Sequence, residues 1–303
     1  MTDPIHICVC ADAPVRVGLH VVLGSAARAL GEGAQLRVTL VDLGLPSGEP
    51  DLLRETLRRA GKPFTLDVVS ADFATFKDLH SLRKLYGSSA PYFKLVLPSQ
   101  IRNASRVIFL DTDVVVCADL SALFCSDLCG HVAGCVPEGP ITIAPEGPYF
   151  QRCGFAPDSL YFNSGVMLID LDRWQREEIS GQCLALIHRD TAEMFSADQT
   201  ALNVVLRERH QPLPAMWNQL AFPNVRAIRP ETAEGLYHLV GRPKPWEPFG
   251  EIVSRQGRFF THHLDQTALA GWRSWRHLGP GAFLRVARLA RSYWRALTRR
   301  EKP

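Results

Sequence analysis

The feature that most constrains the fold is an apolar segment that runs directly into two carboxylates, Arg106-Val-Ile-Phe-Leu-Asp111-Thr-Asp113. Its four consecutive apolar residues, 107–110, predict a strand buried on both faces, and such strands are typical of parallel sheets covered by helices. In these sheets ligands bind at the carboxyl ends of the strands. We therefore expect an α/β protein with its functional site just after residue 110.

The segments around this strand also favour the α/β class. Apolar, β-rich runs alternate with helical patterns in the first half of the chain, which predicts a mainly parallel, Rossmann-like sheet. A strand-like run at 160–171 is interrupted by Asn163-Ser-Gly165, and 213–248 has the proline and aromatic content of loops. We predict strands at 5–10, 36–40, 64–69 and 107–110, and helices at 17–30, 50–60, 91–101, 119–124, 173–189 and 197–209.

Composition excludes several classes of protein. With 46% hydrophobic and 21% charged residues, the chain of 303 residues has the composition of a globular protein rather than a disordered one. No apolar run approaches the length of a membrane-spanning helix, and the N-terminus lacks the basic and apolar segments of a signal peptide. Eight cysteines without any C-x-x-C pair favour free thiols. These features predict a cytoplasmic location.

Charge is distributed unevenly along the chain. The net charge is +3, but residues 271–303 carry nine basic residues and one acid, so the remainder is mildly acidic. At helical spacing the apolar and basic residues of this tail separate onto opposite sides, as in helices that lie on anionic membranes. The apolar members are Val286, Leu289, Ala290, Tyr293, Trp294 and Leu297, and the basic ones are Arg285, Arg288, Arg291, Arg295 and Arg299.

The tail pattern predicts two parts, a catalytic domain at 1–270 and a basic amphipathic tail at 271–303. We expect the tail to hold the protein peripherally on the cytoplasmic face of the inner membrane. A terminal helix docked on the body, with a solvated basic face, is the alternative. Nucleic-acid binding is not expected, because the basic residues are confined to the tail.

Asp111 and Asp113 carry the chemistry that this sequence suggests most strongly. Two carboxylates at i and i+2 can hold a divalent cation, which in turn can hold a diphosphate. His238, at the end of a short apolar run, offers a nitrogen ligand to the same cation. Gly241 would let the backbone approach a phosphate, and Lys244 would neutralise its charge.

The same D-x-D string also fits the first motif of haloacid-dehalogenase phosphatases, in which Asp111 would be the nucleophile. That family places its motif early and adds a later acidic pair. Here at least three predicted strands precede the motif, and no later acidic pair follows a strand. The phosphatase remains an alternative, whereas the P-loop, H-E-x-x-H and G-x-S-x-G motifs are absent from the sequence.

Two motifs together resemble glycosyltransferase family 8, namely D-x-D at 111–113 and H-x-x-G-x-x-K-P-W at 238–246. Members of this family are retaining sugar transferases, and the chain is most similar to the bacterial lipopolysaccharide galactosyl- and glucosyltransferases. The resemblance covers residues 5–250, and a basic tail is also common in the same group. It implies a GT-A type nucleotide-diphospho-sugar transferase fold with a C-terminal basic helical tail.

The resemblance also implies roles for individual residues. Asp111, Asp113 and His238 would bind Mn²⁺, with Mg²⁺ as a second candidate. Asp198 and Gln199, in a segment similar to the family's D-Q-D-x-L-N, would be the catalytic pair on the β-face of the donor sugar. The residues expected to bind the UDP-sugar are Ala11, Asp12, Lys94, Asp111, Thr112, Asp113, Asn163, Gly241 and Lys244.

Three departures from the family pattern qualify these expectations. Ala13-Pro14-Val15 replaces the Asn-Tyr that often stacks on the uracil, so stacking is lost or comes from elsewhere. Thr200 replaces the second Asp of D-Q-D. Pro137-Glu138 occupies a stretch where relatives can carry an acceptor-binding Asp, which implies a different acceptor.

The function expected from these observations is a Mn²⁺-dependent retaining hexosyltransferase. It would transfer galactose or glucose from UDP-galactose or UDP-glucose to lipopolysaccharide or another cell-surface glycan or glycolipid. The departure at 13–15 leaves a second hypothesis, a degenerate transferase that only binds a nucleotide sugar at the membrane. Turnover separates the two, because a binding protein would not release UDP.

Overall fold

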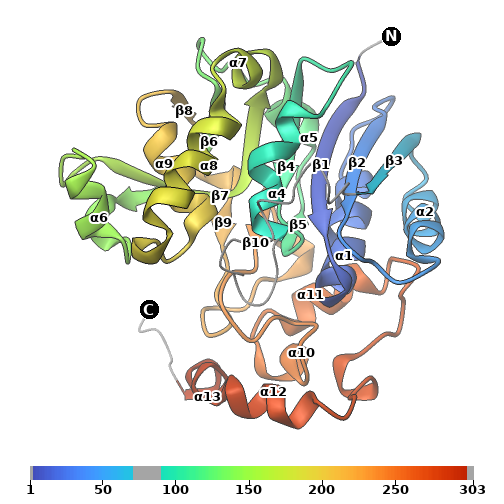
Figure 1. Cartoon of the computed structure of the whole chain (residues 1–303). Coiled ribbons are helices and arrows are strands. Elements are labelled where there is room, and N and C mark those ends of the chain that lie inside the picture. The colour runs from blue at the N-terminus through green and yellow to red at the C-terminus, as the bar shows by residue number, and fades with distance from the viewer. Residues whose placement is uncertain (1–2, 71–89, 299–303) are drawn as a thin grey trace.

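The computed structural model describes residues 3–70 and 90–298, and its centre is a seven-stranded sheet (Figure 1). The strand order is β3-β2-β1-β4-β7-β6-β8, and within this sheet only β7 runs antiparallel to its neighbours. The mainly parallel sheet expected from the sequence is therefore confirmed. The strands are β1 (Ile5–Ala11), β2 (Leu36–Asp42), β3 (Phe64–Ser70), β4 (Arg106–Leu110), β6 (Ala133–Pro140), β7 (Leu160–Asp170) and β8 (His210–Pro212).

Helices cover both faces of the sheet and create two hydrophobic cores. In β1, Ile7 and Val9 point into the core shared with α1 and α2, whereas Cys8 and Cys10 point into the core shared with α4, α8 and α9. This alternation explains why β1 is buried along its whole length. The helices are α1 (Arg16–Arg28), α2 (Glu49–Arg59), α4 (Ala90–Val96), α5 (Leu120–Phe124), α6 (Gly147–Arg152), α7 (Leu171–Arg176), α8 (Ile179–Asp190) and α9 (Ala197–Val205).

A second, three-stranded sheet carries part of the site. Its order is β5-β10-β9, formed by β5 (Val114–Val116), β10 (Leu236–His238) and β9 (Gln219–Leu220). Buried aromatic side chains of α11 (Gly257–Leu264) join Val115 of this sheet to α1 in a third core. Late segments of the chain are thereby fixed against its beginning.

The prediction that the strand-like run 160–171 is interrupted is wrong. Asn163-Ser-Gly165 lies within the continuous strand β7, and the irregularity is taken up by register shifts in its pairing with β6, one of them between Cys135 and Val136. A bulge in one strand lets its partner stay extended. The polar triplet therefore stays on the sheet, next to the end of β4.

Three predicted helices differ from the observed ones. The segment 173–189 forms two helices, α7 and α8, because Glu178 takes a left-handed conformation with φ of 51° between them. The helix predicted at 197–209 ends earlier, at Val205. The helix predicted at 91–101 also ends earlier, at Val96, where a 3-10 turn follows at Leu97–Ser99. Glu178 is an exposed polar residue, where the apolar periodicity gives no warning of a break, whereas α9 ends at the buried residues Val205 and Leu206.

The C-terminal tail folds as two short helices, α12 (Ala282–Arg288) and α13 (Ala290–Thr298), instead of one. Tyr293, expected on the apolar outer side, is 7% exposed, and its hydroxyl donates to the carbonyl of Pro248 on the body at 2.6 Å. Trp294 and Leu297 remain exposed. The tail thus combines docking on the body with an outward apolar surface, and its last residues, 299–303, lie outside the described residues.

None of the described helices combines the length and the apolar character that crossing a bilayer requires. A short helix, α10 (Gly250–Val253), lies between the body and the tail, and Figure 1 shows α10, α12 and α13 together at one end of the molecule.

Candidate metal and donor site

The two carboxylates lie on the turn that follows β4. Backbone hydrogen bonds hold this turn from two sides, since the amide of Asp111 donates to the carbonyl of Gly165 at 2.8 Å and the amide of Leu239 donates to the carbonyl of Asp113 at 2.8 Å. One anchor belongs to β7 and the other follows β10. The turn is therefore fixed by segments distant in the sequence.

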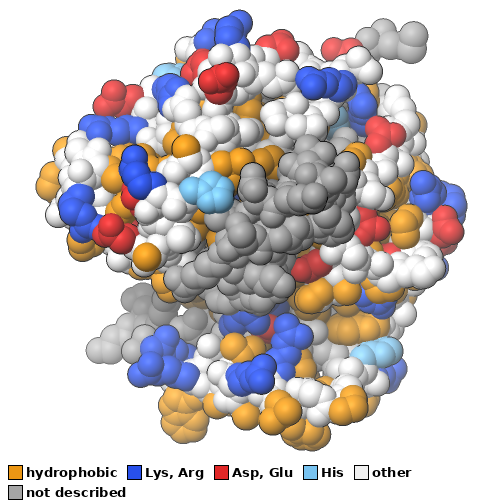
Figure 2. Space-filling view, in the orientation of Figure 1, with side chains coloured by type: hydrophobic (Ala, Val, Ile, Leu, Met, Phe, Trp, Pro, Cys, Tyr) orange, Lys and Arg blue, Asp and Glu red, His pale blue; other side chains and the backbone are white. Residues whose placement is uncertain are grey.

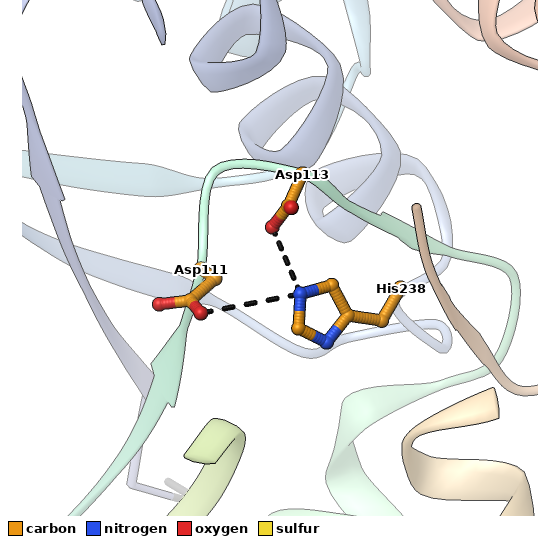
Figure 3. A group of neighbouring side chains, drawn as sticks. All are labelled: Asp111, Asp113 and His238. Atoms are coloured by element: carbon orange, nitrogen blue, oxygen red, sulfur yellow. Dashed lines mark ion pairs between the residues drawn. The ribbon is translucent and has the colours of Figure 1, made fainter. Parts of the chain in front are cut away.

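His238 completes a cluster with these carboxylates (Figure 3). The antiparallel pairing of β10 with β5 places His238 opposite Val114, and its Nε2 lies 3.0 Å from Oδ1 of Asp113 and 4.0 Å from Oδ2 of Asp111. One ligand atom from each of the three residues lies within 4.8 Å of the others. Two carboxylate oxygens and an imidazole nitrogen suit a divalent cation such as Mn²⁺.

Gly165 makes room for the histidine. A Cβ at this position would lie 2.2 Å from Cε1 and 2.6 Å from Nδ1 of His238, far closer than atoms can approach. The imidazole therefore packs directly on the backbone of β7, at the residue whose carbonyl holds Asp111. This contact gives a physical reason for the glycine after Asn163 and Ser164.

Hydrogen bonds fix the orientation of His238. The amide of Gly165 donates to Oδ1 of Asn163 at 2.9 Å, which identifies this atom as the oxygen of the side-chain amide. Nδ2 of Asn218 donates to the same oxygen at 3.1 Å. Oδ1 of Asn218 then faces Nδ1 of His238 at 3.2 Å, which makes Nδ1 the protonated nitrogen. Nε2 is thereby left facing the carboxylates, and it would bind a metal in its unprotonated form. The chain of bonds ends at Glu138, which accepts from Nδ2 of Asn163 at 3.1 Å.

Lys94 links the candidate metal ligands to the candidate catalytic acid. Its ammonium group is buried and lies 3.1 Å from both Asp111 and Asp198, and it also donates to Ser164 at 3.3 Å. Burial alone would lower the pKa of Lys94, but the two carboxylates raise it. Burial raises the pKa of Asp198 in spite of Lys94. A permanent positive charge therefore stands between the two acids.

Asp198 and Gln199 lie in the first turn of α9, close to β7. Oε1 of Gln199 accepts from the amide of Ser164 at 3.0 Å, and its Nε2 is hydrogen-bonded to the hydroxyl of Tyr161. Both ends of the glutamine amide are thus fixed. Thr200, the departure from the family pattern, donates instead to the buried Glu146 at 2.7 Å.

Lys244 approaches the site from the loop after β10. Its Nζ lies 2.5 Å from Oδ2 of Asp113 and 2.6 Å from the carbonyl of Leu239. Burial alone would raise the pKa of Asp113, but Lys244 and His238 lower it well below its usual range. Gly241 has a φ of +78°, a left-handed conformation that glycine adopts without strain.

The remaining candidates lie at the same edge of the sheet. Ala11 ends β1 and Asp12 follows it, and because β1 runs parallel to β4 both residues arrive beside the turn that begins at Asp111. The carbonyl of Thr112 lies 2.5 Å from the position that a Cβ on Gly18 would take, so α1 reaches this turn because of a glycine. The structure therefore brings all the candidate residues to one region.

The model of a known family, Glycosyl transferase family 8, matches residues 6–249. The chain belongs to glycosyltransferase family 8. It is therefore an enzyme of the glycosyltransferase class, and the family decides against the haloacid-dehalogenase alternative.

Two curated relatives illustrate how far this likeness extends. General stress protein A of Bacillus subtilis is 24% identical over 86% of this chain and 93% of its own length. A lipopolysaccharide 1,2-glucosyltransferase of Escherichia coli is 28% identical over 52% of this chain and 49% of its own length.

Solved structures show the fold. The galactosyltransferase LgtC, in complex with donor and acceptor sugar analogs, has a TM-score of 0.70 at 22% identity, with 87% of this chain and 96% of that chain covered. The bifunctional glycosyltransferase WbbM has a TM-score of 0.71 at 17% identity, with 89% and 51% covered. The GT-A type of fold expected from the sequence is confirmed.

Proposed function

We propose that this family 8 enzyme is a Mn²⁺-dependent retaining hexosyltransferase. It transfers galactose or glucose from the UDP-sugar to lipopolysaccharide or another cell-surface glycan, at the cytoplasmic face of the inner membrane. The observation that carries the proposal is the cluster of Asp111, Asp113 and His238, joined through Lys94 to Asp198. The named activities of the lipopolysaccharide glucosyltransferase and of LgtC support a hexose and a surface glycan.

The donor set fits the metal. Asp111, Asp113 and His238 would hold the cation, which when bound supplies Lewis-acid stabilisation of the leaving diphosphate. Lys244 lies next to Asp113 and adds a second positive charge for the phosphates, and Gly241 admits their close approach to the backbone. The protein thus surrounds the leaving group with positive charge before the reaction begins.

Asp198 and Gln199 act on the sugar. As the anomeric bond stretches, positive charge develops on the sugar ring, and a carboxylate and an amide oxygen on the opposite face stabilise it. The ion pair with Lys94 lowers the nucleophilicity of Asp198, and Gln199 is held by Ser164 and Tyr161. These contacts favour front-face substitution over a covalent intermediate.

Release of UDP from a panel of UDP-sugars, with Mn²⁺ and then with EDTA, tests the proposal. We expect release from one hexose donor, loss of release with EDTA, and loss in Asp113→Asn. Asp51→Asn is the matched control, because its side chain is 87% exposed on α2. NMR of the product reports whether the anomeric configuration is retained.

Two outcomes would contradict the proposal. Mn²⁺ binding without UDP release from any donor would favour the nucleotide-sugar-binding hypothesis that the departure at 13–15 leaves open. Full activity of Asp113→Asn would remove the metal-site assignment.

A further inference from the structure

A groove with a volume of about 600 Å³ lies between the tail helices and the loop that follows β10. It is separate from the metal cluster, and its walls combine basic, polar and apolar side chains. The lining residues are Arg242, Gly281, Leu284, Arg285, Arg288, Leu289 and Ser292.

Positive charge in this groove exceeds the negative charge around it. Within the described residues, 3–70 and 90–298, the acid that pairs with the arginines of the groove is Glu247, a 3% exposed carboxylate that is paired with Arg242 and lies 3.7 Å from Arg285. Arg288 forms no ion pair within the part of the chain that the structure describes. Arg242 and Arg285 thus lie at one buried carboxylate while Arg288 adds a further positive charge, and the hydroxyl of Ser292 adds a hydrogen-bonding group. This combination suits a phosphate, to which arginines can donate in pairs.

Apolar surface adjoins the positive charge. Leu284 and Leu289 form part of the groove itself, and exposed apolar side chains lie on the helices around it. Figure 2 shows basic side chains and, below them, hydrophobic ones at the end of the molecule where Figure 1 places α10, α12 and α13. The exposed members are Ile252, Phe283, Trp294 and Leu297, each at least 64% exposed.

We propose that this groove binds the phosphate of an anionic phospholipid, whose acyl chains lie along the neighbouring exposed apolar side chains. A free phosphate or nucleotide would satisfy the arginines but would leave the apolar surface exposed to water. The inference deepens the membrane contact proposed above and rests on it. It replaces a diffuse attraction between the tail and the bilayer with a specific site to which Arg242 of the body contributes.

The groove and the metal cluster share one short loop. Glu247 holds the side chain of Arg242 and accepts from the amide of Lys244 at 2.8 Å, while Nζ of Lys244 binds Asp113. A lipid phosphate at Arg242 is therefore two residues from a side chain of the donor site. Binding at the groove would fix the height of that site above the membrane surface.

Paired variants of the full chain test the proposal. Arg285→Gln with Arg288→Gln removes two charges from the groove, and Arg291→Gln with Arg295→Gln removes two charges from the same tail outside the groove lining. Binding is measured by sedimentation with phosphatidylcholine vesicles that contain phosphatidylglycerol. We expect the groove pair to lose about tenfold more affinity than the control pair, because it also loses charge-assisted hydrogen bonds. Arg288→Gln alone, which breaks no described ion pair, should show part of the same loss.

Soluble probes distinguish the sources of phosphate. Dihexanoyl phosphatidic acid below its micelle concentration should bind saturably to the wild type, and the groove pair should abolish this binding. Equal binding of inorganic phosphate would overturn the lipid assignment in favour of a free-phosphate site. Equal losses in the two arginine pairs would overturn the groove but keep the diffuse membrane contact, whereas no vesicle binding by the wild type would overturn both. UDP release, measured separately, reports on the catalytic proposal and on folding.

Discussion

The metal cluster and the C-terminal tail handle charge in opposite ways. In the cluster each ion has an internal partner, since Lys94 lies between Asp111 and Asp198, and Lys244 pairs with Asp113. Lys94 and Asp198 are buried and the other three groups are partly buried, and salt screens such pairs less than it screens exposed ones. The charges of the cluster are therefore compensated within the protein and held in fixed positions.

The tail is the reverse case. Most of its described arginines are exposed, and Arg288, Arg291 and Arg295 form no ion pair with another described residue, so their charge is available to a partner outside the molecule. The fixed geometry of the cluster comes from segments that are distant in the sequence and joined by backbone pairing. Attraction to a surface needs only local sequence. Single substitutions in the cluster should therefore abolish activity, whereas substitutions in the tail should weaken membrane binding step by step.

Gly165→Ala should have the largest effect. The added methyl group would overlap the ring of His238, and the strand cannot easily move because the Gly165 carbonyl also holds Asp111. We expect Mn²⁺ affinity, measured by electron paramagnetic resonance, and UDP release to fall by about 100-fold. Gly181→Ala is the control, because a Cβ there meets nothing within 4 Å. Unchanged metal affinity would show that His238 is not a ligand.

Asn218→Ala tests positioning without touching a candidate ligand. It removes the acceptor for Nδ1 of His238, so the ring is free to rotate and to change tautomer. Outer hydrogen bonds of this kind contribute about 10- to 100-fold to metal affinity, and we expect a loss in that range in a Mn²⁺ titration. Gln219→Ala, whose side chain donates to a surface carbonyl, should bind Mn²⁺ normally. If both variants bind equally well, the hydrogen-bond chain has no role in metal binding.

Trp294→Ala with Leu297→Ala should weaken the tail alone. Both side chains are more than 60% exposed, and together they provide apolar surface for the bilayer. We expect about tenfold weaker vesicle binding and unchanged UDP release. Tyr293→Phe is the matched control, because it removes the bond to Pro248 and leaves the outer surface intact. A fall in UDP release would mean that the tail supports the catalytic fold.

Acid should have the smallest effect, because it lowers the stability of the folded body and leaves the charge of the tail unchanged. Burial, assisted by Arg37, lowers the pKa of His6 to about 4. Between pH 6.5 and 4 the unfolded chain therefore binds a proton that the folded chain does not, so the free energy of unfolding falls as the pH falls. We expect His6 alone to contribute about 2 kcal/mol to the stability lost between pH 6.5 and 5 in urea denaturation, and the total loss should be smaller by this amount in His6→Gln but unchanged in the exposed control His188→Gln. Arginines keep their charge throughout this range, so vesicle binding should persist.

Much of the sheet and the residues that meet in the cluster could be predicted because their signals are local. Four apolar residues before Asp111 indicate a buried strand, and the carboxyl end of that strand is where such sheets bind ligands. His238 entered the site through its motif and its place at the end of an apolar run. The pairing of β10 with β5 explains why His238 lies beside Asp113, and the sequence alone does not show this pairing.

The rest depended on three-dimensional context. Asn218 lies in a proline-rich stretch without periodicity, and its role follows only from the orientation that Gly165 imposes on Asn163. The division of the tail, with Tyr293 docked and Trp294 exposed, depends on the nearby Pro248 carbonyl. Helical periodicity places both side chains on one side and cannot distinguish them.

The late position of β10 has a consequence for synthesis on the ribosome. Every strand of the large sheet has been translated by Pro212, whereas His238 arrives with the last-made strand of the small sheet. A chain released between these points carries both carboxylates and the strands of the whole main sheet, but it lacks His238 and Lys244. Translation therefore completes the cluster of Asp111, Asp113 and His238 after the main sheet, and we expect prematurely terminated products to be inactive.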